Sequence, residues 1–160
     1  MTKSTRQKQR AAALQFIAAA WLNLSAWRPV DLRGVRVAVK FRRQRWASTG
    51  LASTSRAHGQ ADVIVRLGED EADGLATLLH ELAHVAAARR GHSGHDRGWR
   101  EIFRAAAREV TGEEIADVRA NVALTDLVAD AIRRKWQFEM AAGRTTRVTE
   151  DETDAREAKE

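Results

Sequence analysis

Apolar residues recur at helical spacing near the start of the chain. Leu14, Ile17 and Trp21 follow one another at three- and four-residue steps, which predicts an amphipathic helix with one buried face. We expect this helix to continue to Trp27 and to end before Pro29, because proline cannot donate the backbone hydrogen bond that a helix interior needs.

The pattern then changes to the two-residue period of β-strands. Between residues 35 and 42, valine and phenylalanine alternate with alanine, lysine and arginine, which predicts a half-buried strand. Residues 48–50 are expected to form a turn and residues 51–56 a second short strand. The apolar run Val63–Leu67, bounded by glycines, predicts a third. Because the connections are short, we expect a small, mostly antiparallel sheet of about three strands.

Helical spacing returns after the third strand. Acidic residues at positions 69–73 favour a helix start, and Gly91 lies where a helix of about twenty residues would end. Asp96 is placed to cap a second helix, which is expected to end at Gly112. One long or two shorter helices are expected to follow, up to Met140. The predicted fold is therefore α+β, with an N-terminal helix, a small sheet and several C-terminal helices.

Length and composition narrow the classes of protein. The chain has 160 residues, about the length of one domain, and we divide it into a flexible N-terminus (1–7), a folded domain (8–141) and a disordered acidic tail (142–160). No window approaches the ~18 apolar residues of a membrane span, so no membrane association is expected. The chain has no cysteine, which excludes disulfides and Cys-ligated zinc and fits a cytoplasmic location.

Charge is distributed unevenly along the chain. Among the first 46 residues the single acid is Asp31, whereas the basic residues there are Lys3, Arg6, Lys8, Arg10, Arg28, Arg33, Arg36, Lys40, Arg42, Arg43 and Arg45. This Arg-rich N-terminal half is typical of a surface that contacts DNA or another polyanion. A solvated basic surface has the same composition, and the sequence leaves both interpretations open.

The segment with the clearest chemistry is the H-E-L-A-H motif at residues 80–84. Residues four apart on a helix share a face, so His80 and His84 can ligate one metal ion. Glu81 is near enough to reach a water molecule there, as in the H-E-x-x-H pattern of zinc metallopeptidases. A catalytic zinc needs a third ligand, and both His92 and His95 follow at reachable positions. We prefer His95, because it opens the next helix.

The motif predicts peptide-bond hydrolysis. Zinc would lower the pKa of water toward ~7, and Glu81 would accept the proton and pass it to the leaving amine. The oxyanion needs a further donor, for which His58, Arg97 and the backbone are candidates that the sequence does not rank. An exposed turn residue is the simpler interpretation of His58.

Other residues are expected to support this site. Trp99 would pack against the metal-binding helix and fix the approach of the third ligand. His92, if it is not the ligand, would lie in the loop beside the metal. Val63–Leu67 leads directly into the metal-binding helix, so we expect it to lie along the cleft and to pair with an extended peptide.

The segments Thr77–His84 and His95–Trp99 resemble the SprT-like zinc metalloprotease domain. In that family an H-E-x-x-H helix is followed by an H-G-x-x-F/W motif that opens the next helix, and the resemblance covers about residues 35–110. It implies a zincin-like fold and substrates that are bound or crosslinked to DNA. The resemblance implies that His80, His84 and His95 bind zinc and that Glu81 is the catalytic glutamate. Asp96 replaces the usual glycine, and the family's Cys-based zinc ribbon is absent, which leaves DNA contact to the Arg-rich segment.

Two functions from different classes remain. One is a zinc-dependent peptidase that acts on protein or peptide substrates, including DNA-associated proteins. The other is a basic nucleic-acid-binding or regulatory module with a structural or degenerate metal site. A zinc nuclease is less favoured, because a three-histidine nuclease site has no need of the glutamate after the first histidine. The sequence does not indicate the oligomeric state.

Overall fold

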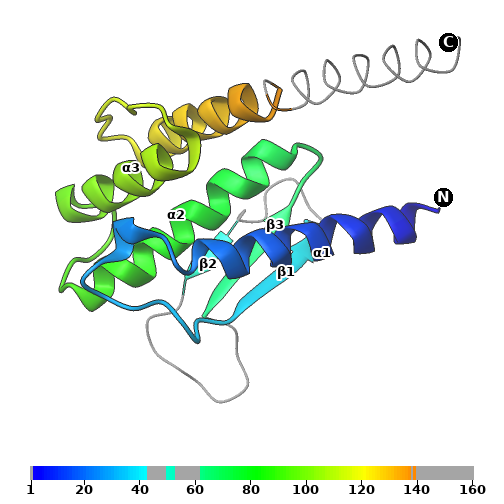
Figure 1. The fold of residues 1–160 in the computed structure, drawn as a ribbon, viewed down its shortest axis with the longest axis horizontal. Coiled ribbons are helices and arrows are strands. Elements are labelled where there is room, and N and C mark those ends of the chain that lie inside the picture. The colour runs from blue at the N-terminus through cyan, green and yellow to red at the C-terminus, as the bar shows by residue number, and fades with distance from the viewer. Residues whose placement is uncertain (1, 43–49, 53–61, 138, 140–160) are drawn as a thin grey trace, which may run out of the picture.

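Helix α2 (Glu71–Arg89) is the element against which the rest of the structure packs (Figure 1). In the computed structural model, which describes residues 2–42, 50–52, 62–137 and 139, α2 lies between a small sheet and helix α3 (Arg97–Thr111). Buried apolar side chains from the helices and the sheet join in one core, so the predicted α+β class is confirmed.

Local capping explains where α2 begins and ends. The Asp70 carboxylate accepts a hydrogen bond from the backbone N–H of Asp73 (3.1 Å), and Glu71 and Asp73 place negative charge at the positive end of the helix. Gly91 follows the last turn with a φ of +84°, a left-handed conformation that glycine adopts without strain. The acidic start and the glycine stop predicted from the sequence are confirmed.

The sheet contains strands β1 (Val37–Phe41), β2 (Gly50–Ala52) and β3 (Val63–Leu67) in the order β1-β3-β2. β1 and β3 are parallel, whereas β2 is antiparallel to β3. The expectation of a mostly antiparallel sheet is therefore wrong for the longer of the two pairings. Consecutive strands β1 and β2 do not pair, because the most apolar strand, β3, takes the central position between them. Gly50, expected in a turn, opens β2, and residues 53–56 of the predicted second strand lie outside the described residues.

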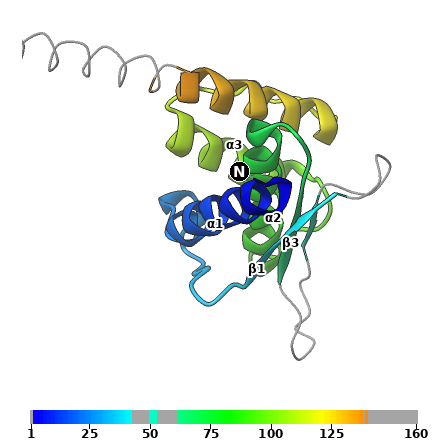
Figure 2. The ribbon, with the colours of Figure 1, turned by 90° about the vertical axis from the view of Figure 1, so that its right-hand side faces the viewer.

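One face of the sheet packs against helices. Val63, Val65 and Leu67 alternate as the buried positions of β3, and α2 covers that strand. Helix α1 (Lys3–Trp21) lies beside α2 and covers β1, so that both helices lie on the same side of the sheet (Figure 2). Arg10 joins these layers: its guanidinium is 2.7 Å from a Glu71 carboxylate oxygen and donates a hydrogen bond to the carbonyl of Gly68.

Helix α1 ends earlier than predicted. The sequence pattern indicated a helix up to Trp27, but the helix stops at Trp21, and Ser25–Trp27 forms the short 3-10 helix η1. The indole N–H of Trp27 donates to the carbonyl of Trp21 (2.7 Å) and so satisfies one of the last carbonyls of α1. Burial of the Trp27 ring thus folds the chain back before the proline that was expected to end the helix.

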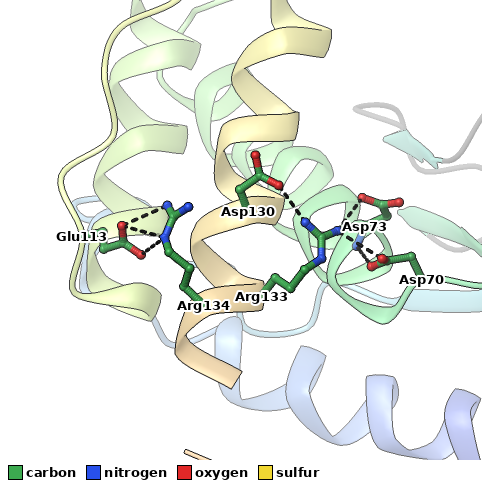
Figure 3. A network of polar contacts seen from close by, with 6 residues as sticks. All are labelled: Asp70, Asp73, Glu113, Asp130, Arg133 and Arg134. Atoms are coloured by element: carbon green, nitrogen blue, oxygen red, sulfur yellow. Dashed lines mark hydrogen bonds and ion pairs between the residues drawn. The ribbon is translucent and has the colours of Figure 1, made fainter. Parts of the chain in front are cut away.

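A C-terminal helix (residues 121–137) packs beside α2 and α3 and completes the core. Its buried residues are Leu124, Val128, Ala129, Ala131 and Ile132. Arg133 ties this helix to the start of α2 through Asp70 (3.1 Å) and Asp73 (3.7 Å), and Arg134 pairs with Glu113 (3.0 Å) in the segment before the helix (Figure 3). The sequence predicted one long or two shorter helices here. The described residues form one helix, preceded by an irregular segment at residues 113–118.

The predicted division of the chain into a flexible N-terminus, a folded domain and an acidic tail can be compared with the structure only in part. Helix α1 begins at Lys3, within the part (1–7) that was expected to be flexible. The predicted acidic tail, residues 142–160, lies outside the described residues. None of the described helices combines the length and the apolar composition that a membrane span requires.

Candidate metal centre

Three histidine side chains converge at the middle of α2. His80 and His84 come from the helix, one turn apart, and His95 comes from the turn that leads into α3. The Nε2 atom of His84 lies 3.2 Å from that of His80 and 3.0 Å from that of His95, and the His80–His95 distance is 3.1 Å. The structure thus brings His95, and not His92, to the H-E-x-x-H pair.

The turn after α2 delivers His95 through backbone that suits glycine. Gly91 and Gly94 both have positive φ, of +84° and +59°. Asp96, which stands where the SprT-like motif has glycine, caps α3: its carboxylate accepts a hydrogen bond from the N–H of Trp99 (2.8 Å). An aspartate at this position therefore helps to build the turn.

His92 serves this turn and does not join the metal cluster. Its Nδ1 atom lies 3.3 Å from the Asp96 carboxylate. Its ring also lies over Gly98, where an added Cβ would come within 2.2 Å of the imidazole. A larger residue at position 98 would therefore force the ring of His92 to move.

Trp99 forms the floor of the site. It is fully buried, and its ring centroid lies 4.7 Å from that of His80, 5.1 Å from that of His84 and 4.5 Å from that of His95. The His84 ring stacks on it with an interplanar angle of 21°. The indole N–H also points to the carbonyl of His80 at 3.4 Å. Trp99 therefore limits the positions that all three imidazole rings can take.

The protonation of the rings favours metal binding. Burial, reinforced by the neighbouring histidines, lowers the pKa of His80 to about 3 and the pKa of His84 to about 4. Burial also lowers the pKa of His95. The rings are therefore neutral near pH 7, and a neutral imidazole has one nitrogen with a free lone pair. In the tautomers that place a lone pair on each Nε2 atom, these lone pairs repel one another unless a cation lies between them.

The spacing of the nitrogens fits a tetrahedral metal. With Zn–N bonds of about 2.0–2.1 Å, two ligands of a tetrahedral zinc are roughly 3.3–3.4 Å apart. The observed separations of 3.0–3.2 Å are close to this value. The donor set and its geometry therefore fit an ion held by three imidazoles.

Glu81 lies next to His80 in the sequence, and its side chain is buried at the wall of the cleft. Burial raises the pKa of its carboxyl to about 7. Strand β2 approaches it closely: a Cβ added to Gly50 would lie 2.7 Å from Oε1 of Glu81 and 2.7 Å from Cγ2 of Thr77. The sequence carried no signal for this contact beyond the glycine itself.

A cleft of about 830 Å³ opens over the histidines. It is bordered by β2, by Arg66 of β3, by α2, by the turn that carries His95 and by the first turns of the C-terminal helix, so part of β3 lies along the cleft as expected. The expectation that β3 pairs with a peptide is wrong for Val63–Val65, because these residues already pair with β1 on one side and with β2 on the other. The strand at the sheet edge beside Glu81 is β2.

Arg97, another of the candidates, does not line this cleft. Arg97 is exposed on α3 and forms an ion pair with Glu101 (2.9 Å) on the surface. His58 lies outside the described residues.

The structure adds two residues that sequence reasoning missed, both from the C-terminal helix. The Thr125 hydroxyl lies 2.9 Å from Nδ1 of His80, and the Asn121 amide nitrogen lies 3.1 Å from Nε2 of His95. Nothing in the sequence near these residues marks them as part of a metal site, because the contact joins segments that are far apart in the chain.

No protein-family model, curated protein or solved structure matches the chain significantly. The functional interpretation therefore depends on the residues of the site and their geometry.

Proposed function

We propose that the protein is a zinc-dependent peptidase of the SprT-like, zincin-like type. The observation that carries this proposal is the convergence of three neutral imidazoles beside a buried glutamate in an open cleft. The order of elements also supports it: a helix, a small sheet, the H-E-x-x-H helix and a third histidine that opens the next helix.

The residues that would hold zinc are His80, His84 and His95, each through Nε2. Zinc bound there supplies Lewis acidity, which polarises a substrate carbonyl and lowers the pKa of water. Trp99 beneath the rings and the turn around Gly94 keep the three donors in place before any ion arrives, which reduces the entropy lost on binding.

Glu81 is the general base in this proposal. Its carboxylate accepts a proton from the attacking water and later donates it to the amine that leaves the substrate. The tight contact with β2 limits where this carboxylate can lie, since Gly50 and Thr77 flank it. A fixed position matters because proton transfer needs hydrogen-bond distance to the reacting water.

The substrate would bind as an extended peptide along β2. Within the described residues β2 is an edge strand, so its outer N–H and C=O groups are placed to pair with a peptide by strand addition. A cleft of about 830 Å³ has room for several side chains of such a peptide.

The open geometry favours catalysis over a purely structural metal site. Structural zinc sites are almost always closed by four protein ligands, whereas catalytic sites keep one position for water. In the part of the chain that the structure describes, the cluster offers three donors, and it faces the cleft. This favours the peptidase over the alternative of a binding module with a structural ion.

We further propose that the substrates include DNA-associated proteins and that the protein acts in the cytoplasm. Lys3, Arg6 and Lys8 are exposed along α1 and can meet phosphates, whereas Arg10 is engaged by Glu71. The test of DNA binding therefore concerns the basic surface of α1.

The test of the peptidase is Glu81→Gln. The variant should keep one zinc per chain and the fold, and lose cleavage of a fluorescently labelled unfolded protein by about 100-fold or more. Glu101→Gln is the matched control, because Glu101 pairs with Arg97 on the surface. Undiminished cleavage in Glu81→Gln, or a purified wild type that binds no zinc, would refute the proposal.

A further inference from the structure

The first turns of the C-terminal helix supply a hydrogen bond to the metal centre. Thr125 projects from this helix toward α2, and its Oγ1 atom lies 2.9 Å from Nδ1 of His80. The same hydroxyl donates a hydrogen bond of 2.7 Å to the backbone carbonyl of Asn121, four residues earlier. A continuous chain of hydrogen bonds thus runs from the imidazole of His80 into the helix backbone.

The direction of these bonds follows from the number of protons. A threonine hydroxyl has one proton, and in this structure the Asn121 carbonyl, which can only accept, receives it. Oγ1 can then only accept from His80, so Nδ1 of His80 carries the ring proton. In a neutral imidazole this leaves the lone pair on Nε2, the atom that lies 3.1 Å and 3.2 Å from the Nε2 atoms of His95 and His84.

The rest of the C-terminal helix is held firmly enough for this contact to be fixed. Leu124 and Val128, on either side of Thr125, are fully buried. Two turns further on, Arg133 pairs with Asp70 at the start of α2 and with Asp130 on its own helix (Figure 3). Both ends of the contact therefore lie on packed elements.

We propose that Thr125 is a positioning residue of the metal centre, which fixes the ring of His80 in the tautomer whose Nε2 lone pair faces the ion. Ligating histidines in general depend on such a partner for the second ring nitrogen, and loss of the partner typically weakens metal binding by about 10–100-fold. Thr125 acts through His80, whose Nδ1 atom it contacts, and is not one of the three donors to the ion. The inference concerns metal binding by the three histidines, which is also the basis of the proposed function.

The first experiment measures the tautomer in the metal-free wild-type protein. Long-range 1H–15N NMR spectra distinguish an imidazole protonated on Nδ1 from one protonated on Nε2. We expect His80 to be protonated on Nδ1. Protonation on Nε2 would overturn the inference, whatever the protein catalyses.

The second experiment measures Zn²⁺ affinity by competition with a chromophoric chelator. Thr125→Val, which keeps the shape and removes the hydroxyl, should weaken affinity by about 10–100-fold, whereas Thr125→Ser should stay within about threefold of the wild type. Thr111→Val is the matched control, because the Thr111 hydroxyl makes the same kind of bond to the carbonyl four residues earlier (2.7 Å) but lies at the end of α3. It should leave the affinity unchanged.

The outcomes separate this inference from the proposed function. Wild-type affinity in Thr125→Val, or an equal loss in Thr111→Val, would overturn the role of Thr125 while leaving the peptidase intact. A wild type that binds no Zn²⁺ would refute the peptidase, and the NMR measurement would still decide the tautomer. If Thr125→Val does not fold, Thr125→Ser and the wild-type spectrum carry the test.

Discussion

Gly50→Ala tests the contact that holds the proposed general base. The added Cβ would lie 2.7 Å from Oε1 and 2.8 Å from Cγ of Glu81, and 2.7 Å from Cγ2 of Thr77. Non-bonded carbon atoms approach one another comfortably to about 3.5 Å, so the methyl carbon is about 0.7 Å too close to Cγ of Glu81 and about 0.8 Å too close to Cγ2 of Thr77. Residue 50 does not have a positive φ, so the backbone itself accepts alanine.

The expected effect is larger on activity than on metal binding. Crowding of this kind costs about 1–3 kcal/mol of folding free energy, because buried neighbours must shift. Displacing a catalytic group by about 1 Å costs on the order of 100-fold in rate. The added methyl group does not have a histidine among its nearest contacts, so the zinc affinity should remain that of the wild type.

Two other glycines provide the controls. At Gly68 an added Cβ would meet Arg42 at an ordinary 3.7 Å, so Gly68→Ala should change neither stability nor activity. At Gly74 it would come within 2.6 Å of Leu67, so Gly74→Ala should destabilise the fold without touching Glu81. The assays are kcat/KM on a labelled unfolded protein, urea unfolding and zinc titration. The reasoning is refuted if Gly50→Ala keeps wild-type kcat/KM, or if Gly74→Ala loses as much activity for the same loss of stability.

Three further predictions concern the ligands, the pH and the salt. His95→Ala removes one of the three ligands and should lower zinc affinity by about 100-fold or more, whereas His92→Ala should keep the wild-type affinity. Metal analysis after dialysis measures the difference. Equal losses in the two variants would contradict the assignment of His95 as the third ligand. Burial opposes ionisation of Glu109, but hydrogen bonds from the N–H groups of Ser25 and Ala26 lower the pKa of its carboxyl below 4.5. The carboxylate therefore stabilises the fold above pH 4.5. This stabilisation is lost as the pH falls through the lowered pKa of the folded protein. Glu109→Gln should therefore destabilise by about 1 kcal/mol at pH 7 and by almost nothing near pH 2 in urea unfolding, and an equal difference at both pH values would rule this out. If the basic surface of α1 binds DNA, affinity in gel-shift assays should fall steeply between 50 and 200 mM salt, and a flat response would remove DNA from the proposal.

Local signals in the sequence predicted the helices that carry the site. The acidic residues at 69–73 lie at the start of α2, and Gly91, Asp96 and Gly112 bound α2 and α3 as expected, because caps and glycine stops depend on residues within one turn of each other. The His80–His84 spacing is likewise local, and the short turn that follows left few positions for a third donor.

Contacts between distant segments could not be predicted in the same way. Three apolar strands joined by short connections are compatible with a simple antiparallel meander, and the pattern does not show that β3 lies between β1 and β2, where it packs against α2. Helix α1 ends at Trp21 because the indole of Trp27 folds back, a contact that a periodic pattern does not show. Gly50 and Thr125 reach the site from other elements, and neither belongs to a motif.

The position of the C-terminal helix has a consequence for where this protein can be shortened. The proposed resemblance to SprT-like domains extends only to about residue 110, yet Leu124, Val128 and Ala131 are fully buried, and Arg133 links their helix to the start of α2. A fragment cut after Thr111 would expose the apolar surface that these side chains cover and would also lack the hydroxyl beside His80. The smallest piece that can be expected to fold with its metal site intact therefore extends to about residue 137.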